Sequence, residues 1–402
     1  MHILLVHNHY QIRGGEDSVF ETECDLLRSV GHDVQTWEKH NDDIRERRGP
    51  LSKLSLFLGT IWDQNAYRNM RARLRADRPD VVHVHNFFPQ FSPSIFWACS
   101  REKVPVVLTL HNYRLTCLNG YLYRDGTGIC EKCLGKCPWA GVKRRCYRDS
   151  LGASLAVAVM LVVHRMLGTW RRKVDRFIAL TEFSKEKFVE AGLPADKIVV
   201  KPNAVDVPSP ATAPAPHDGL RVIYIGRLSS EKGVDVLVRA WNLLHENAKP
   251  VPNAELWIVG DGPERETLEH LASASPALPI RFFGAKPHAE ALDLLRQSDL
   301  LVLPSVCYEQ FSTTVMESMA CGVPALVSEC AGHSTLVEPG VSGRFFRTND
   351  PDDLQAILHE LLQSSEILAH MGAAARNRYN SCDCNSVANV SHLTTIYRNL
   401  SS

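Results

Sequence analysis

The chain has 402 residues, of which 45% are hydrophobic and 22% charged, and its formal net charge at pH 7 is zero. This length allows two domains, and the ordinary composition excludes a collagen-like, disordered or repeat protein. The charge is unevenly distributed, because residues 1–205 carry 31 Lys and Arg against 22 Asp and Glu, whereas residues 206–402 carry 14 against 23. The asymmetry favours two separate domains, the first facing an anionic partner such as a membrane surface, a phosphorylated acceptor or nucleic acid. Mutual attraction of the two halves is the alternative.

The first half alternates short apolar runs with helical patterns. A helix is predicted at residues 16–30, ending before Gly31, and strands are predicted at residues 3–6, 81–84, 106–110, 177–180 and 198–200. Strands that alternate with helices indicate an α/β fold, in which a parallel sheet is covered on both faces and ligands bind beyond the carboxyl ends of the strands. Because a strand begins at once, with no basic and apolar leader, we expect no secretory signal and a cytoplasmic location.

Two of these strand ends carry candidate binding residues. Gly14 and Gly15 lie between the first strand and a helix, where a backbone without side chains can approach a phosphate, although such a pair is more often a simple turn. His111 directly follows the strand at residues 106–110 and is placed to hydrogen-bond a substrate. A structural histidine is the alternative.

A cysteine-rich insert at residues 117–146 holds five of the twelve cysteines. Disulfides are disfavoured in the cytoplasm, so clustered cysteines there more often bind a metal or react. Four thiolates suit a closed, tetrahedral zinc site, and we expect its ligands to be Cys117, Cys130, Cys133 and Cys146, with Cys137 as a spare. Free thiols and a disulfide are the alternatives.

The apolar stretch at residues 151–163 is free of charge and has basic residues on both sides. It is too short to span a bilayer, which takes about 20 apolar residues. It is therefore either a buried core helix or an interfacial helix. The interfacial alternative predicts peripheral contact with the inner face of the membrane, where the basic flanks would meet anionic lipids.

Residues 206–219 are predicted to be a linker, because they contain four prolines and show no periodicity. The alternation then restarts, with strands expected at residues 221–225, 255–259, 280–283, 300–303 and 325–327. The predicted organisation is a first domain at residues 1–205, a second at 220–380, and a C-terminal helix at 381–402 that packs back on the first domain.

Residues 300–327 combine two apolar strands with a small-residue helix that opens near Ser312. The amides of residues 312–314 lack partners within the helix and suit an anion. Glu309 lies in the preceding loop, where its carboxylate can accept hydrogen bonds from hydroxyl groups, and Glu317 lies about one turn further along the helix. A polyhydroxylated ligand that carries a phosphate would satisfy these groups together. Two surface glutamates beside an exposed helix are the alternative.

The loop after the strand at residues 221–225 contains Arg227 and Lys232 beside glycines. Two cations and free backbone amides can converge there on a diphosphate. Loops rich in glycine or acidic residues also follow the next three strands, among them the loop that begins with Gly284 and Ala285. Four such loops at one sheet edge indicate a binding site.

In order and spacing, these motifs resemble those of the retaining, GT-B-fold glycosyltransferases of family 4. In the second half the resemblance rests on Gly226-Arg227-Leu-x-x-Glu231-Lys232-Gly233, Val259-Gly260-Asp261-Gly262-Pro263, Glu309-x7-Glu317 and Ala320-Cys-Gly322-Val-Pro324. In the first half it rests on Gly14-Gly15, His111 and Lys201-Pro202-Asn203. The resemblance covers nearly the whole chain and is closest to bacterial enzymes that build surface polysaccharides.

The resemblance implies a GT-B architecture, with two doubly wound Rossmann-like domains that face a central cleft. It further implies a nucleotide-diphosphate sugar as the donor and a glycan or lipid-linked acceptor in polysaccharide biosynthesis. No catalytic metal is expected, because an arginine and a lysine neutralise the leaving phosphate.

Donor-binding residues implied by the resemblance lie at strand ends and helix starts: Gly14, Gly15, Arg227, Lys232, Gly284, Ala285, Phe311, Ser312, Thr313, Thr314 and Glu317. Within this set, Arg227 and Lys232 would hold the diphosphate and Glu317 the ribose. Glu309 and His111 are implied to be catalytic and to contact the transferred sugar.

Two loops depart from the family pattern. The first glutamate is commonly followed by Gly-Phe-Gly, whereas here Gln310, Phe311 and Ser312 follow it, so that side chains lie where the donor sugar would lie. The later family loop, usually Gly-Gly followed by a glutamate, contains Gly332 and His333 here, and no role is carried over to it.

Several alternatives stay open at this point. Retention is compatible with front-face attack, in which the leaving phosphate takes the proton of the acceptor, and with a covalent intermediate on Glu309. A nucleotide-sugar epimerase or phosphorylase on the same fold is a competing function. A nucleic-acid-binding module formed by the basic half is disfavoured, because the insert has a single Cys-x2-Cys pair and no basic run interleaved with aromatic residues.

Overall fold

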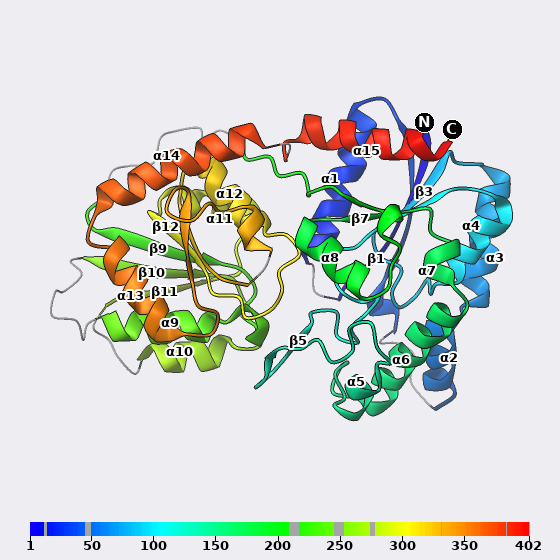
Figure 1. The fold of residues 1–402 in the computed structure, drawn as a ribbon, viewed down its shortest axis with the longest axis horizontal. Helices are drawn as coiled ribbons and strands as arrows, with labels where there is room; N and C mark the ends of the chain where they lie inside the picture. The colour runs from blue at the N-terminus through cyan, green and yellow to red at the C-terminus, as the bar shows by residue number, and fades with distance from the viewer. Residues whose placement is uncertain are drawn as a thin grey trace. The chain divides into compact units, whose positions relative to one another are not determined.

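Two parallel β-sheets organise the chain, one in each of two units (Figure 1). Unit 1 comprises Met1–Leu122, Cys130–Ala204 and Cys384–Ser402, and unit 2 comprises Tyr123–Ile129 and Val205–Asp383. The computed structural model describes residues 1–11, 14–44, 50–208, 217–244, 253–273, 278–330, 332–382 and 384–401. Most of the predicted linker, residues 209–216, lies outside the described residues.

The sheet of unit 1 has the strand order β2-β1-β3-β4-β7-β8, and the neighbouring strands are parallel. The bounds are β1 (His2–His9), β2 (Asp33–His40), β3 (Val81–Val84), β4 (Val106–Thr109), β7 (Arg176–Ala179) and β8 (Ile198–Val200). The order reverses between β1 and β3, and open α/β sheets bind their ligands at such switch points.

Helices cover the sheet of unit 1 and connect its strands. They are α1 (Gly15–Ser29), α2 (Pro50–Ile61), α3 (Gln64–Ala76), α4 (Ser94–Glu102), α5 (Trp139–Lys143), α6 (Leu151–Met166), α7 (Thr169–Arg172), α8 (Glu182–Glu190) and α15 (Ser386–Ser401), with the short 3-10 turns η1 (Asn41–Ile44) and η2 (Ala195–Lys197). The C-terminal helix α15 buries Leu393 and Tyr397 in one core with Ile3, Phe20 and Leu27. Each such apolar side chain contributes about 1.5–3 kcal/mol when fully buried, so α15 is part of the core of unit 1.

The apolar stretch that the sequence left as a buried or an interfacial helix forms α6. Its Val157, Met160 and Leu161 are buried, and the helix packs against α2 and α5. Among the described helices, none combines the length and the apolarity that a bilayer-spanning helix needs. The packing favours the buried-helix alternative. The prediction of membrane contact then rests on exposed basic residues near the two ends of α6, such as Lys143 and Arg171.

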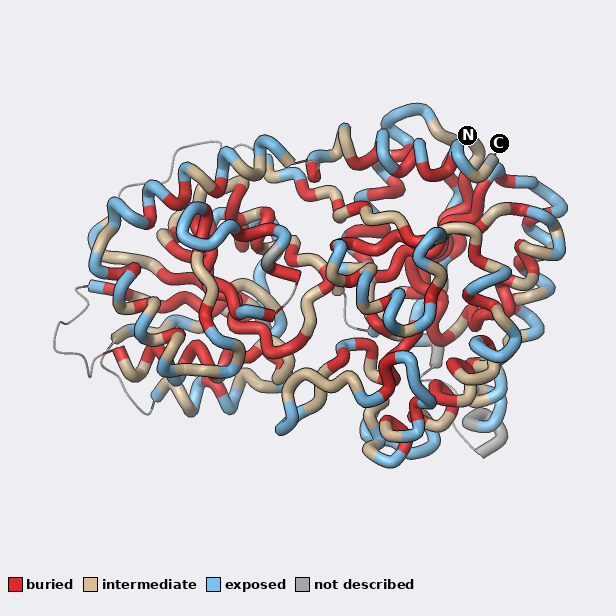
Figure 2. Tube along the Cα trace, in the orientation of Figure 1, coloured by how far each residue is buried: buried red, intermediate tan, exposed pale blue. Residues whose placement is uncertain are grey.

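The sheet of unit 2 has the order β11-β10-β9-β12-β13-β14 and is also parallel. Its strands are β9 (Leu220–Ile225), β10 (Ala254–Val259), β11 (Ile280–Gly284), β12 (Leu300–Leu303), β13 (Ala325–Ser328) and β14 (Gly343–Phe346). Counted along the chain, this is the 3-2-1-4-5-6 order of the Rossmann fold, with its switch point between β9 and β12. Figure 2 shows the strands of both sheets as largely buried.

The connections of unit 2 are mostly helical. They are η3 (Ser230–Lys232), α9 (Val234–Leu243), α10 (Arg265–Ser273), α11 (His288–Arg296), α12 (Thr313–Cys321), η5 (His333–Thr335), α13 (Pro351–Leu361) and α14 (Ser365–Ser381). Inside the cysteine-rich insert, β5 (Tyr123–Arg124) and β6 (Gly128–Ile129) form an antiparallel hairpin. By its contacts this hairpin groups with unit 2, whereas the cysteines on either side of it belong to unit 1.

Candidate active site

The strand order of unit 2 brings the loops after β9 and β12 together at the switch point. Lys232 ends the short turn η3 after β9, and Glu309 lies in the loop between β12 and α12. The Nζ atom of Lys232 donates to Oε1 of Glu309 at 2.7 Å, although the two residues are 77 positions apart. The hydroxyl of Ser305 donates to the same oxygen at 2.6 Å. A cation and a carboxylate, both predicted from the sequence, thus meet at one point.

Their surroundings keep both members of this pair charged. Burial by itself would raise the pKa of Glu309, but the charge of Lys232, the electrostatic interaction with His333 and the hydrogen bonds from Lys232 and Ser305 lower it to about 2. Burial also disfavours the ammonium group of Lys232, but the carboxylate of Glu309 outweighs this effect and raises its pKa. At neutral pH, Glu309 is therefore an ionised hydrogen-bond acceptor.

Two glycines allow these loops to pack closely. Gly233 has a φ of 63°, and a Cβ atom there would lie 2.2 Å from the carbonyl oxygen of Pro304. Gly332 has a φ of 112°, and a Cβ atom there would lie 2.0 Å from the carbonyl oxygen of Glu309. A side chain at either position would push these backbones apart, so the glycines are required for the observed contact.

Helix α12 begins at Thr313, close to the predicted start at Ser312. The side chain of Ser312 caps the helix by accepting a hydrogen bond from the N–H of Val315 at 3.3 Å. The first-turn amides of Thr313 and Thr314 have no acceptor within the helix and suit an anion. Glu317, on the same helix, accepts a hydrogen bond from Nε2 of His288 at 2.8 Å, and this bond raises the pKa of His288.

The other predicted donor-binding residues of unit 2 lie at the same edge of the sheet. Arg227 follows β9 and is exposed. Gly284 ends β11 with a φ of 70°, and Ala285 after it is exposed. Because β11 is separated from β9 by one strand, these two residues lie further along the edge than Lys232. Phe311 is half-buried at the start of α12.

Two buried polar residues near Glu309 were not predicted. His333, in η5, interacts electrostatically with Glu309, and burial lowers its pKa. Gln310 is 8% exposed, and in the described structure neither atom of its amide, nor Nε2 of His333, has a hydrogen-bond partner. Buried polar groups normally have partners, so ligand hydroxyl groups are natural partners here. The sequence signal was the departure from Gly-Phe-Gly at Gln310.

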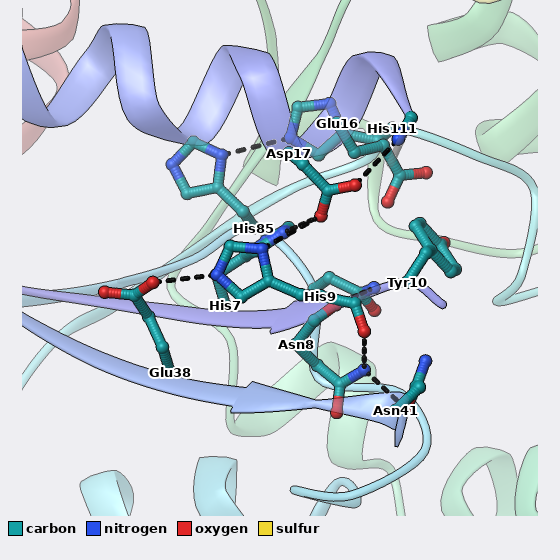
Figure 3. A network of polar contacts seen from close by, with 12 residues as sticks. His7, Asn8, His9, Tyr10, Glu16, Asp17, Glu38, Asn41, His85 and His111 are labelled. Carbon is teal, nitrogen blue, oxygen red and sulfur yellow. Dashed lines mark hydrogen bonds and ion pairs between the residues drawn. The ribbon is translucent and has the colours of Figure 1, made fainter. Parts of the chain in front are cut away.

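In unit 1, histidines gather at the switch point (Figure 3). His85 follows β3 and His111 follows the neighbouring strand β4, so that Nδ1 of His85 lies 3.1 Å from Nε2 of His111. The two rings stack with their centroids 5.3 Å apart. On its other side, Nε2 of His85 lies 3.4 Å from Oε2 of Glu23, whose second oxygen accepts a hydrogen bond from Lys201 at 2.8 Å.

The protonation of these histidines follows from that geometry. Burial lowers the pKa of His111 to about 3 and the pKa of His85 well below its ordinary value, so both rings are neutral at pH 7. One of the two facing nitrogens, Nδ1 of His85 or Nε2 of His111, donates a hydrogen bond to the other, and the tautomers of the rings decide which one donates. The tautomer with the proton on Nε2 of His111 leaves its Nδ1 as a hydrogen-bond acceptor.

The loop after β1 is tied to the start of α1 by Asp17. His7 and His9 lie on the same face of β1, and their rings contact Oδ1 of Asp17 at 2.8 and 3.2 Å (Figure 3). The other carboxylate oxygen of Asp17 accepts the N–H of Gly14 at 2.8 Å. This bond fixes Gly14 and Gly15 at the point where the helix begins.

Two groups of side chains in the described residues have potential metal-binding atoms within 4.8 Å of one another: His7, His9 and Asp17, and Glu23, His83 and His85. Both groups are already joined by hydrogen bonds or ion pairs. In the second group, the two ring nitrogens of His83 each lie 2.7 Å from a hydroxyl, those of Tyr397 and Thr109. We assign no metal to either group.

Glu16, which the sequence analysis did not single out, lies beside this histidine network. Nδ2 of Asn112, the residue after His111, donates to Oε1 of Glu16 at 2.6 Å and also contacts the hydroxyl of Tyr10 at 3.1 Å. Burial raises the pKa of Glu16 to about 7, because these hydrogen bonds compensate only in part for the lost hydration.

We expect Glu16→Gln to stabilise the protein at alkaline pH. The pKa of Glu16 is higher in the folded chain than its ordinary value of 4.5, so its contribution to stability is fully present below that value and is lost as the pH rises through about 7. At about pH 8 the free energy of unfolding of the variant should therefore exceed that of the wild type by roughly 1–3 kcal/mol, and its unfolding temperature should be higher. Both differences should vanish near pH 4.5. Thermal unfolding across this range is the measurement, with the exposed Glu21→Gln on the same helix as the control. An equal effect at both ends of the range would contradict the assignment.

Comparison with known families accounts for both halves of the chain. Residues 13–208 match the model described as Glycosyltransferase Family 4, and residues 209–378 match the model described as Glycosyl transferases group 1. The chain is a glycosyltransferase. The resemblance noted in the motifs is thereby confirmed at this level.

Curated relatives of this glycosyltransferase act on different substrates. It is 28% identical over 387 residues to a phosphatidyl-myo-inositol mannosyltransferase of Mycolicibacterium smegmatis, covering 93% of this chain and 88% of the relative. It is also 28% identical to a D-inositol 3-phosphate glycosyltransferase of Catenulispora acidiphila, over 74% of this chain and 67% of the relative.

Solved structures support the fold of this glycosyltransferase. A sucrose-phosphate synthase of Thermosynechococcus elongatus superposes with a TM-score of 0.71 at 17% identity, covering 99% of this chain and 98% of the other. HepE of Anabaena in complex with UDP-glucose superposes with a TM-score of 0.68 at 17% identity, covering 99% and 100%. The predicted α/β fold of GT-B type, with two Rossmann-like domains, is confirmed.

Proposed function

We propose that this glycosyltransferase moves a hexose, with retention of configuration, from a nucleotide-diphosphate sugar to a glycan or lipid-linked acceptor in polysaccharide biosynthesis. The observation that carries the proposal is the ion pair of Lys232 and Glu309 at the switch point of unit 2. A cation suited to a phosphate and a carboxylate suited to sugar hydroxyls lie in contact there. The UDP-glucose bound by the similar HepE supports a nucleotide sugar as the donor.

The donor diphosphate would be held by cations and backbone amides. Lys232 and the exposed Arg227 would each contribute charge-assisted hydrogen bonds. The amides at the start of α12 add to the anion site of unit 2. In unit 1, the amides of Gly14 and Gly15 at the start of α1 would suit a phosphate. Glu317 would accept hydrogen bonds from the ribose hydroxyls at the positions that its bond to His288 leaves open.

At the reacting centre, Glu309 and His111 would orient the transferred sugar as hydrogen-bond acceptors. A carboxylate whose pKa is about 2, and which already accepts hydrogen bonds from Lys232 and Ser305, is a weak nucleophile. This favours front-face attack over a covalent intermediate on Glu309. In that route the acceptor oxygen bonds to the anomeric carbon, the bond to the leaving phosphate oxygen breaks, and this oxygen takes the acceptor proton.

A screen of nucleotide sugars by thermal shift tests the proposal. A ligand that binds only the folded chain stabilises it by about 2.7 kcal/mol at a concentration 100 times its Kd, so the correct donor should raise the unfolding temperature by several degrees. The nucleoside without phosphates is the control for binding of the base and the ribose alone. Mass analysis of the product formed with an added acceptor then distinguishes transfer from epimerisation, which would change the nucleotide sugar without an acceptor. Absence of a shift with every nucleotide sugar would contradict the proposal.

A further inference from the structure

The segment between β4 and α6 contains little regular structure. Residues 110–150, all of which are described, have regular elements only in β5, β6 and α5. Connections longer than about 12–15 residues without secondary structure are uncommon in compact domains. Even so, Cys117, Leu118, Leu122 and Leu134 of this segment are buried. Neither a sheet nor a long helix explains how the segment is held in place.

Four cysteines of this segment lie close together in unit 1. The position of a Cβ atom at Gly141 lies 3.5 Å from the sulfur of Cys133, and the Gly141 N–H donates to the carbonyl of Pro138 at 3.1 Å. The sulfur of Cys133 therefore lies beside Gly141.

Backbone hydrogen bonds position Cys146 and Cys130, and packing at Gly141 positions the chain next to Cys117. The N–H of Cys146 donates to the carbonyl of Gly141 at 2.9 Å, next to Cys133. The N–H of Cys130 donates to the carbonyl of Leu122 at 2.7 Å, which closes the base of the hairpin. Cys117 precedes Leu118, whose side chain occupies the space in which a Cβ of Gly141 would lie. Cysteines up to 29 positions apart in the chain are thus brought together by the fold.

The turn through Cys130 and Cys133 has a geometry suited to paired ligands. The N–H of Leu134 donates to the backbone carbonyl of Glu131 at 3.0 Å, and the N–H of Lys136 donates to the backbone carbonyl of Cys133 at 3.2 Å. Gly135 continues the turn with a φ of 64°, a conformation that glycine adopts readily. Two cysteines separated by two residues are the usual ligand spacing of structural zinc sites.

The sequence around these cysteines is basic. Residues 130–148 contain one acidic residue, Glu131, and six basic residues: Lys132, Lys136, Lys143, Arg144, Arg145 and Arg148. Neighbouring cations stabilise thiolates, which are the form of cysteine that binds metals. Zinc held by four thiolates is a doubly negative centre, so this basic environment would offset its charge.

We propose that Cys117, Cys130, Cys133 and Cys146 bind one Zn²⁺ in a closed tetrahedral site that fixes this segment. Among the described residues, no three of these four sulfur atoms lie within 4.8 Å of one another. To bind one metal ion, the side chains must therefore rotate toward a common centre. Cys117 must also give up its hydrogen bond from Sγ to Oδ1 of Asn119, which is 3.0 Å long. The four thiols release their protons as the four Zn–S bonds form.

Metal analysis of wild-type protein purified without a histidine tag is the first test. We expect about one equivalent of zinc per chain. After removal of zinc with a chelator, added Co²⁺ alone should produce the intense sulfur-to-cobalt charge-transfer absorption of a tetrahedral thiolate site. Less than about half an equivalent of zinc, together with no such absorption, would overturn the proposal.

Single substitutions identify the ligands. Cys133→Ser should lower the bound zinc to below about half an equivalent and reduce the unfolding temperature. Cys137→Ser is the matched control, because Cys137 is exposed in the same segment, and it should keep its full zinc content. If Cys133→Ser does not fold, the zinc content of the Cys137→Ser variant and the Co²⁺ spectrum of the wild type still decide. Loss of zinc from Cys137→Ser, or its retention in a folded Cys133→Ser, would overturn the ligand set. None of these measurements depends on the proposed sugar transfer.

Discussion

Replacing Glu309 with glutamine should lower the rate of sugar transfer at least about 100-fold, the scale seen when one preorganised polar group is removed from an active site. The amide keeps the size of the side chain but loses the negative charge, and its NH2 group cannot accept a hydrogen bond from a sugar hydroxyl. We expect the Kd of the free nucleoside diphosphate to change only a few-fold, because this ligand lacks the transferred hexose that Glu309 is proposed to contact. Steady-state kinetics and calorimetric titration are the measurements.

The control for this substitution is Glu360→Gln. Glu360 is an exposed carboxylate of unit 2 that pairs with Arg344 at 3.0 Å, away from the switch point. The Glu360→Gln variant should retain full activity. Wild-type activity in Glu309→Gln would remove Glu309 from the active site, and a large loss of diphosphate affinity would mean that Glu309 acts mainly by positioning Lys232.

The same variant has a predicted pH dependence of stability. The pKa of Glu309 is lowered in the folded chain, to about 2 from its ordinary value of 4.5. Its ionised form therefore stabilises the folded state above pH 4.5, and this contribution is lost as the pH falls toward about 2. The difference in unfolding temperature between the wild type and Glu309→Gln should be present at neutral pH and shrink over that interval.

Lys232→Ala and Arg227→Ala should each weaken nucleoside diphosphate binding by about 1.5–3 kcal/mol, because in the proposed donor site each cation makes a hydrogen bond to the diphosphate. This corresponds to roughly 10- to 150-fold in Kd. Their effects on stability should differ. Lys232→Ala leaves the carboxylate of Glu309, which is 15% exposed, without its cation, and should lower the unfolding temperature, whereas Arg227 is exposed and its loss should leave that temperature unchanged.

The nucleoside without phosphates is the control ligand for both variants. Its affinity should be the same in the wild type, Lys232→Ala and Arg227→Ala, because neither cation is assigned to the base or the ribose. Unchanged diphosphate affinity in either variant would remove that residue from the donor site. Equal destabilisation by the two substitutions would contradict the prediction that the ion pair between Lys232 and Glu309 stabilises the folded chain.

The interior strands of both sheets could be predicted from the sequence, but the strands β2 and β14 could not. A strand in the middle of a parallel sheet is covered on both faces, so it consists of a continuous apolar run, as in β3 and β12. β2 and β14 lie at sheet edges, as do β8 and β11, whose apolar residues allowed them to be predicted. There, β2 buries little more than Val34 and Trp37 and is otherwise largely exposed, and this pattern resembles a loop when only apolar runs are sought.

The candidate residues themselves could be predicted because they follow strand ends or open helices. The sequence by itself determined the α/β class, the loops that carry Arg227, Lys232 and Glu309, and the start of α12 near Ser312, since hydrophobic periodicity and capping are local properties of the chain. Periodicity also led to His111, because it follows a predicted strand, and the cysteine spacing could be read directly from the chain.

Only the tertiary structure decided which of these residues meet. The contact of Lys232 with Glu309 depends on β12 pairing with β9, and the contact of His111 with His85 depends on β4 pairing with β3. Strand order is set by the packing of the whole domain, and no local pattern encodes it. Burial likewise depends on elements that are distant in the chain. The sequence therefore did not reveal that burial raises the pKa of Glu16, or that the buried amide of Gln310 lacks a hydrogen-bond partner among the described residues.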